Sequence, residues 1–209
     1  MTGKLILIRH QESEWNKLGK WTGRTDVHLS EVGQKNGENI GYLINDLKID
    51  KAYTSTLVRT IETLNCISKT CKLDDVPTEK CHELNERDYG EYTGKNKWEL
   101  EKEVGEKKFQ EIRRGWSCPI PGGETLSDVY DRVVPFYKQR VLPELTQGKN
   151  ILIIAHGNSL RALVKYLENI SDTEICILEF SFDKVYIYDV DQEGKMLEKK
   201  VRDTHYATI

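Results

Sequence analysis

The sequence predicts an α/β fold, a three-layer sandwich with a mostly parallel central sheet and helices on both faces. Two short, unbroken apolar runs, at residues 5–8 and 151–154, are typical of strands buried on both faces of a parallel sheet. Segments with apolar residues at helical spacing lie between the strand candidates. This alternation predicts layered α/β architecture, and 209 residues suit a single domain, 1–209.

The remaining elements follow from local patterns. Residues 51–55 and 185–190 are weaker strand candidates. Ser30 can cap a helix whose apolar face consists of Ile40, Leu43, Ile44 and Leu47. Further helical patterns cover 57–71, 126–145 and 158–168, and Pro135 predicts a kink or a junction of two helices because proline lacks an N–H. We expect the polar, Arg- and Lys-rich segment 85–124 to be an inserted, partly helical lid or substrate clamp.

Composition excludes several classes of protein. No segment approaches the ~20 apolar residues that span a bilayer, and the four-residue apolar run near the N-terminus is too short for a signal peptide, so we expect a cytoplasmic protein. A net charge of −3 without a basic tail speaks against nucleic-acid binding. Five cysteines without a C-x-x-C spacing speak against a disulfide framework and a four-ligand zinc site.

Two distant segments share one pattern: four apolar residues, one further residue, a histidine, and a serine three positions later. The histidines are His10 and His156. In open α/β sheets, ligands bind beyond the carboxyl ends of the strands, where helix N-termini favour anions. If the two strands are neighbours, the pattern places both histidines at one anion site.

A neutral histidine at such a strand end can attack phosphorus, because its unperturbed pKa of ~6.5 leaves the free base available near neutral pH. A hydrogen bond from its other nitrogen to a backbone carbonyl would fix the tautomer, and Arg9 offers a planar fork for phosphate oxygens. Two alternatives stay open at this point: structural histidines, and a metal pair. A metal site normally requires a third ligand, and Arg9 disfavours a cation there.

The stretch Arg9-His10-Gln11-Glu12-Ser13 resembles the histidine phosphatase superfamily, and later motifs resemble its phosphoglycerate mutase branch, the type that depends on a bisphosphoglycerate cofactor. The motifs occur in order over nearly the whole chain: Asn16, Thr22-Gly23, Ser30, Arg59, Leu84 to Gly90, Asn96-Lys97, Arg113-Arg114, Gly123-Glu124 and Ala155 to Ala162.

The resemblance implies a phosphoglycerate mutase-like fold and the interconversion of 2- and 3-phosphoglycerate, in glycolysis and gluconeogenesis, through a phosphohistidine at His10. It implies that Glu86 is the acid/base for the substrate hydroxyl, and that Arg9, Arg59 and His156 hold the phosphoryl oxygens. It also implies a set of substrate-binding residues: Ser13, Asn16, Thr22, Gly23, Arg87, Tyr89, Lys97, Arg113, Arg114, Gly157 and Asn158.

The implied cofactor is 2,3-bisphosphoglycerate, which primes His10, and no metal is implied because arginines and helix ends carry the charge. The partner is a small anionic phosphorylated substrate, with no nucleic acid and no membrane. The short stretch between Arg114 and Gly123 favours a monomer or weak homo-oligomer. The alternative is a phosphatase of the same superfamily acting on a small phosphorylated metabolite. A non-catalytic scaffold is a third hypothesis.

The chain departs from the family pattern at two places. Gln11 stands where the family has glycine; its side chain either crowds the phosphate or donates an amide hydrogen bond. If a positive φ is needed there, glutamine costs about 1–2 kcal/mol. The stretch Glu179-Phe180-Ser181-Phe182 stands where mutases carry a Thr-Gly loop that lines the site.

Overall fold

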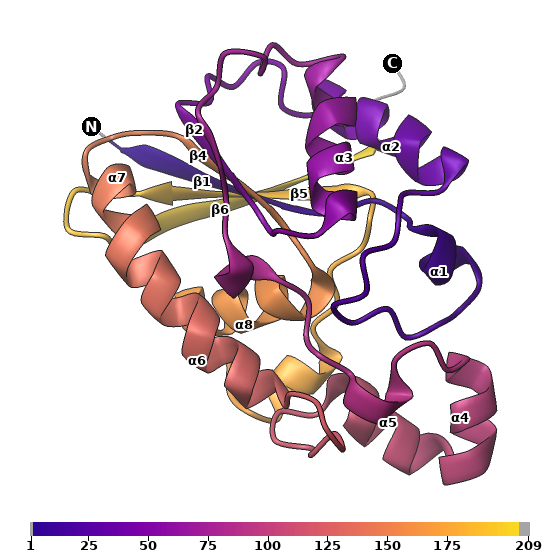
Figure 1. Cartoon of the computed structure of the whole chain (residues 1–209). Coiled ribbons are helices and arrows are strands. Elements are labelled where there is room, and N and C mark those ends of the chain that lie inside the picture. Colours follow the sequence, from indigo (N-terminus) through magenta and orange to yellow (C-terminus); the bar gives the residue numbers. More distant parts are fainter. Residues whose placement is uncertain (1, 205–209) are drawn as a thin grey trace.

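The computed structural model describes residues 2–204. Over this part of the chain, six strands form one twisted sheet, seen nearly edge-on in Figure 1. Their order is β3 (Thr78–Lys80), β2 (Lys51–Thr54), β4 (Ile151–Ala155), β1 (Gly3–Arg9), β5 (Lys184–Val190) and β6 (Met196–Asp203). The first four strands are parallel, and β5 and β6 are antiparallel to their neighbours. The predicted mostly parallel sheet is confirmed.

Helices cover both faces of this sheet, as predicted. Figure 1 shows α2 (Glu31–Tyr42) and α3 (Val58–Ser68) on one face, and α6 (Leu126–Phe136) and α8 (Gly157–Leu167) on the other. Successive side chains of β1 point to opposite faces of the sheet. Ile6 and Ile8 pack against α2 and α3, whereas Leu5 and Leu7 pack against α6 and α8. The apolar run at 5–8 is therefore buried on both sides.

The helix predicted after Ser30 begins as expected, because the Ser30 side chain accepts a hydrogen bond from the N–H of Gly33. It ends at Tyr42, earlier than its apolar pattern suggested. Leu43 and Ile44 continue in turns with i→i−3 hydrogen bonds and are still buried. The pattern thus identified core residues correctly but not the helix end.

The predicted junction at Pro135 is confirmed. Pro135 lies in the last turn of α6, and the chain continues as a π-helical segment, η3 (Tyr137–Val141), and then as α7 (Leu142–Thr146). Since proline cannot donate the regular helical hydrogen bond, the bonding pattern changes just beyond it. The remaining short helices are α1 (Glu14–Lys17), η1 (His82–Leu84) and η4 (Glu174–Ile177).

Two strands were not predicted, β3 and β6. Both lie at sheet edges, and their sequences, Thr-Glu-Lys and Met-Leu-Glu-Lys-Lys-Val-Arg-Asp, are mostly polar because most of their side chains face solvent. Apolar patterns find buried strands far better than such edges. None of the helices within residues 2–204 is long and apolar enough to cross a membrane.

The segment 85–124 forms η2 (Gly90–Tyr92), α4 (Lys97–Val104) and α5 (Glu106–Arg114). Figure 1 shows α4 and α5 projecting away from the sheet layers. They carry an apolar core of their own, made of Trp21, Tyr89, Leu100, Phe109, Ile112 and Ile120. The segment is partly helical, as expected, and this core fixes α4 and α5 against the loop that contains Trp21. Its role as a lid or substrate clamp stays a prediction.

Candidate active site

Strand register brings the two histidines together. β1 and β4 are hydrogen-bonded neighbours, with Arg9 opposite Ala155, so the next residue of each strand is a histidine. The His10 backbone N–H donates to the Ala155 carbonyl at 2.9 Å, and the two imidazole centroids lie 4.8 Å apart. The sequence pattern therefore corresponds to one site at the carboxyl end of two adjacent parallel strands.

His10 is held in one tautomer. Its Nδ1 lies 2.7 Å from the carbonyl oxygen of Gln11, and since a carbonyl only accepts, Nδ1 carries the proton and Nε2 keeps its lone pair. Burial, followed by the charges of Arg59 and Arg9, holds the pKa of His10 well below its usual value, although the Gln11 contact acts in the opposite direction. His10 is thus a neutral imidazole at neutral pH, with an Nε2 lone pair that is chemically able to act as a nucleophile.

His156 lies behind His10 and is fully buried, so it does not itself line the cavity. Its Nε2 lies 2.7 Å from the Ser55 hydroxyl, and within residues 2–204 its buried Nδ1 has no hydrogen-bond partner. Burial, and then the charge of Arg59, holds the pKa of His156 well below its usual value. Nδ1 is therefore available for a hydrogen bond to a ligand oxygen.

A cavity opens in front of His10, and its lining contains thirteen of the sixteen predicted site residues. They are Arg9, His10, Asn16, Thr22, Gly23, Arg59, Glu86, Tyr89, Lys97, Arg113, Arg114, Gly157 and Asn158. Four further residues, to which no role was assigned from sequence, also line it: Trp21, Arg161, Glu179 and Phe180. The walls thus carry six cationic side chains and two acidic ones among the described residues.

Two arginines of the site, the half-buried Arg9 and the buried Arg59, are oriented by backbone carbonyls. Arg9 donates through Nη1 to the Phe180 carbonyl at 2.6 Å, and Arg59 donates to the carbonyls of Gly23 and Thr25 at 2.8 and 2.9 Å. Burial lowers the pKa of Arg59 to about 10, so it stays charged. The Nε groups of Arg9 and Arg59 are buried and have no partner within residues 2–204. Donors left free in this way fit a ligand with several anionic oxygens.

Arg161 is the cationic side chain of the site that the sequence analysis missed. It lies one helical turn after Asn158, whose Oδ1 accepts from its Nη1 at 2.9 Å, so helical spacing from the histidine motif was the available signal. Its Nη2 donates to the carbonyls of Arg114 and Ile175 at 2.8 and 2.7 Å. Arg161 thereby connects α8 to the end of α5 and to η4.

Glu86 lies in the same cavity with its carboxylate fixed from two sides. Its Oε1 accepts hydrogen bonds from the Arg87 N–H at 2.7 Å and from the backbone and side-chain amides of Asn158 at 3.2 and 3.1 Å. Asn158 also donates to the Tyr89 hydroxyl at 2.8 Å. A Cβ added to Gly157 would lie 3.8 Å from both Glu86 Oε2 and the Arg9 guanidinium, so the glycine keeps open the space between them.

The segment 85–124 contributes Lys97, Arg113 and Arg114 to the cavity, all partly buried. Burial, and then the charges of Arg113 and Arg9, lower the pKa of Lys97 to about 8. Burial also lowers the pKa of Arg113. The site therefore holds more positive charge than its own acids neutralise, which is the condition for binding a small polyanion.

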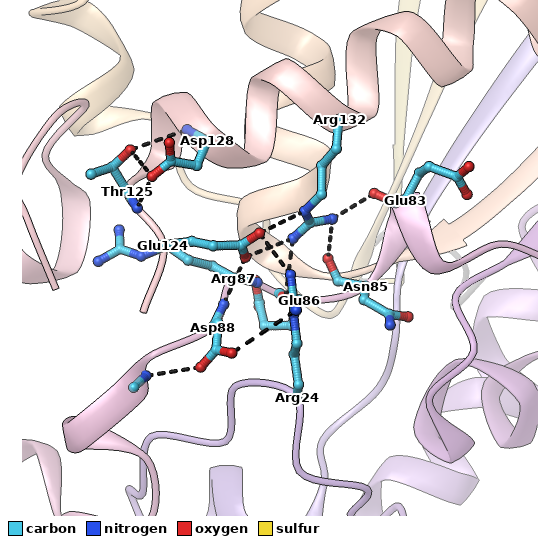
Figure 2. Close-up of polar contacts among 11 residues, drawn as sticks. Arg24, Glu83, Asn85, Glu86, Arg87, Asp88, Glu124, Thr125, Asp128 and Arg132 are labelled. Carbon is cyan, nitrogen blue, oxygen red and sulfur yellow. Dashed lines mark hydrogen bonds and ion pairs between the residues drawn. The ribbon is translucent and has the colours of Figure 1, made fainter. Parts of the chain in front are cut away.

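A hub of ion pairs holds the Glu86 loop in place, as Figure 2 shows. Arg132 of α6 donates to the carbonyls of Glu83, Asn85 and Glu86 at 2.5, 2.9 and 3.2 Å. The same guanidinium makes a two-pronged ion pair with Glu124, at 3.0 Å for each contact.

Glu124 connects this hub to a second loop of the site. It accepts hydrogen bonds from the Asp88 N–H at 2.9 Å and from Arg24 at 2.7 Å (Figure 2). Burial alone would raise the pKa of Glu124, but its bonds to Arg132 and Asp88 outweigh burial and keep the pKa low. Arg24 follows Gly23, whose carbonyl orients Arg59, so one ionised carboxylate connects the loop of Glu86 to the loop of Gly23.

Ser13 and Arg87, both predicted to bind substrate, lie outside the cavity lining. The Ser13 hydroxyl caps α1 by accepting from the Asn16 N–H, and so positions Asn16, which does line the cavity. The Arg87 side chain is fully buried and donates to the carbonyl of Ile112 in α5 at 2.6 Å. Neither side chain faces the cavity in this structure, because capping of α1 and packing against α5 direct them away from it, and their predicted role in substrate binding stays a prediction.

Gln11 neither crowds the cavity nor reaches into it. Its side chain is fully buried, and Nε2 donates to the carbonyls of Phe182 and Arg9 at 2.9 and 3.2 Å. Asn169 is the non-glycine residue with positive φ in the described part of the chain, so the expected strain at Gln11 is absent. Gln11 therefore does not crowd the cavity, and the amide hydrogen bonds that it donates go to backbone carbonyls and connect β1 to the stretch 179–182.

Residues 2–204 contain no group of three or more histidine, cysteine, aspartate or glutamate side chains that could hold a metal ion. The independence from metals that the sequence analysis expects stays a prediction.

Comparisons with known proteins agree with this geometry. Residues 5–202 match the family model of the histidine phosphatase superfamily (branch 1). A relative from Buchnera aphidicola subsp. Cinara cedri, named 2,3-bisphosphoglycerate-dependent phosphoglycerate mutase, is 40% identical over 93% of this chain and 96% of its own. A relative of the same name from Treponema denticola is 40% identical over 94% of this chain and 91% of its own.

Solved structures share the fold. The structure described as Bacillus stearothermophilus YhfR has a TM-score of 0.80 at 23% identity, covering 93% of this chain and 94% of its own. The alpha-ribazole phosphatase from Shigella flexneri has a TM-score of 0.77 at 25% identity, covering 96% and 95%. The chain belongs to the histidine phosphatase superfamily and, within it, to the family of the relatives named 2,3-bisphosphoglycerate-dependent phosphoglycerate mutase.

Proposed function

We propose that this chain is a 2,3-bisphosphoglycerate-dependent phosphoglycerate mutase that interconverts 2- and 3-phosphoglycerate through a phosphohistidine. The observation that carries the proposal is His10: a neutral imidazole with a free Nε2, at a cavity lined by six cationic side chains among the described residues. The name of the relatives at 40% identity supports the same reaction, and with it a place in glycolysis and gluconeogenesis in the cytoplasm.

In the first step, His10 Nε2 forms a bond to phosphorus while the bond from phosphorus to the ligand oxygen breaks. Glu86 donates a proton to the departing oxygen. In the second step, a substrate hydroxyl returns its proton to Glu86 as it attacks the phosphorus and releases His10. Arg9 and Arg59 neutralise the charge on the phosphoryl oxygens during both steps, and His156, whose ring burial keeps neutral, hydrogen-bonds to one of these oxygens through Nδ1. The partly unpartnered donors of these three side chains support that assignment.

Lys97, Arg113 and Arg114 bind the carboxylate and the phosphate that is not transferred. Their position on the lid, away from β1 and β4, supports a role at the far end of the ligand. Such a site suits a polyanion with two phosphates, which is the chemistry of the priming cofactor 2,3-bisphosphoglycerate. The phosphatase interpretation has weaker support, from fold neighbours such as the alpha-ribazole phosphatase.

The test is the conversion of 3-phosphoglycerate to 2-phosphoglycerate, measured with and without added 2,3-bisphosphoglycerate, together with phosphate release. A mutase converts the isomers, depends on the bisphosphate and releases little phosphate. Rapid phosphate release without isomer conversion would instead identify a phosphatase. Absence of both activities from folded protein would refute the proposal.

A further inference from the structure

One acidic side chain in the cavity has no part in the proposed reaction. Glu86 is buried and held by Asn158, but Glu179 lies in the stretch between η4 and β5, with its side chain 59% exposed. Glu179 accepts a hydrogen bond from Nη2 of Arg114 at 2.7 Å. A carboxylate in a cavity built for anions requires an explanation.

Glu179 remains ionised because the hydrogen bond to Arg114 lowers its pKa, an effect that outweighs partial burial. Glu179 is therefore already paired with Arg114, the arginine that the proposed function assigns to the end of the ligand away from the transferred phosphate. An entering carboxylate or phosphate meets an arginine that already has an anionic partner, and two anions at one cation repel each other.

The two partners differ in their freedom to move. The Arg114 side chain is only 18% exposed and its Nη1 donates to the Leu178 carbonyl at 3.4 Å, while Arg161 holds the Arg114 backbone carbonyl, so Arg114 has less freedom to move. Phe180, the next residue after Glu179, is 2% exposed, and its carbonyl is held by Arg9. Of the two partners, only the more exposed Glu179 side chain can swing into solvent, and the mostly buried charge of Arg114 then requires an anionic group of the ligand as its new partner.

We propose that Glu179 is a specificity-determining residue: an internal counter-anion that competes with the ligand for Arg114. A ligand with a carboxylate or second phosphate away from the transferred phosphate must displace Glu179, whereas a phosphate monoester without that group need not. The ligand class rests on the proposed function. The competition weakens the hold on 2,3-bisphosphoglycerate and so raises the concentration needed to keep His10 phosphorylated.

The test compares Glu179→Gln with the wild type in equilibrium binding by calorimetry. The probes are 3-phosphoglycerate, which has the distal carboxylate, and glycerol 3-phosphate, which lacks it. Removing the charge should tighten 3-phosphoglycerate about three- to fivefold, as expected for one partly exposed ion pair, and change glycerol 3-phosphate less than twofold. Glu193→Gln, the same charge change in the exposed β5–β6 turn outside the cavity lining, is the matched control.

Equal tightening of both probes, or of neither, would overturn the proposal. A double variant, Glu179→Gln with Arg114→Met, should lose the preference for 3-phosphoglycerate; if it keeps that preference, Arg114 is not the contested cation. These binding results are independent of the mutase assay. If the wild type converts no phosphoglycerate but Glu179→Gln still selects the carboxylate ligand, the proposed function fails and this inference stands.

Discussion

The imidazole rings of His10 and His156 lie with their centroids 4.8 Å apart and their planes inclined by 57°. They reach this distance because β1 and β4 are parallel neighbours in a register that sets Arg9 opposite Ala155. Neither ring is oriented by the other: His10 is held by the Gln11 carbonyl and His156 by Ser55. Each histidine can therefore be changed with a defined expectation.

His10→Ala should abolish isomer conversion, by at least about 1000-fold in kcat, because no other group would form the bond to phosphorus. Incubation with labelled 2,3-bisphosphoglycerate should leave an acid-labile, base-stable label on the wild type and none on the variant. His28→Ala, which removes an exposed histidine paired with Glu62, should keep both the label and the activity. Turnover by His10→Ala at the wild-type rate would rule out the covalent route.

The rise of KM at alkaline pH should follow the loss of the proton from Lys97. Its pKa of about 8 in the free protein means that the ammonium is present below pH 8 and lost above it. Since an anionic ligand requires the charged form, binding above pH 8 takes up a proton, and KM should rise by up to about tenfold per pH unit. Steady-state kinetics between pH 7 and 9.5 measure this rise. Lys97→Arg, which stays charged, should flatten it; an unchanged rise would assign it to another group.

Alanine substitutions at two glycines should have different effects, one on activity and the other on stability. Gly157→Ala places a methyl group 3.8 Å from the Arg9 guanidinium and from Glu86 Oε2, an ordinary contact with protein but in the space for the ligand. We expect kcat/KM to fall about 10- to 100-fold with little change in Tm. Gly33→Ala, by contrast, places its methyl 2.1 Å from the Glu12 carbonyl and should lower Tm by about 3–10 °C. A lower Tm with unchanged kcat/KM for Gly157→Ala, or a lower kcat/KM with unchanged Tm for Gly33→Ala, would contradict the role given to that glycine.

Arg132 is expected to act on catalysis through the Glu86 loop. Arg132→Met removes its bonds to three loop carbonyls and to Glu124, so kcat should fall about 10- to 100-fold while KM changes little. Arg132→Lys should recover part of the rate, because one ammonium cannot span all four partners.

Arg140→Met serves as the control for this variant, since Arg140 is an exposed arginine paired with Glu79 at the edge of the sheet. If Arg132→Met lowered only the Tm and left kcat intact, Arg132 would be structural and would not position Glu86.

Local patterns predicted the fold well where burial was strong. The apolar runs at 5–8 and 151–154 are strands, and the helical patterns became α2, α3, α6, α7 and α8. The edge strands β3 and β6 were not predicted, because strands that face solvent contain few apolar residues in a recognisable pattern. Most cavity residues were identified through the family resemblance, since a short motif at a strand end keeps its place relative to the backbone.

The sequence alone determined that a histidine directly follows each of two strands and that a polar insertion rich in charged residues interrupts the α/β pattern. Only the tertiary structure decided which side chains face the cavity. It turned Ser13, Gln11 and Arg87 away, and it brought Arg161 and Glu179 in. The physical reason is that periodicity describes a residue's relation to its own element, whereas a site forms between elements whose register, lid packing and ion pairs depend on the whole chain.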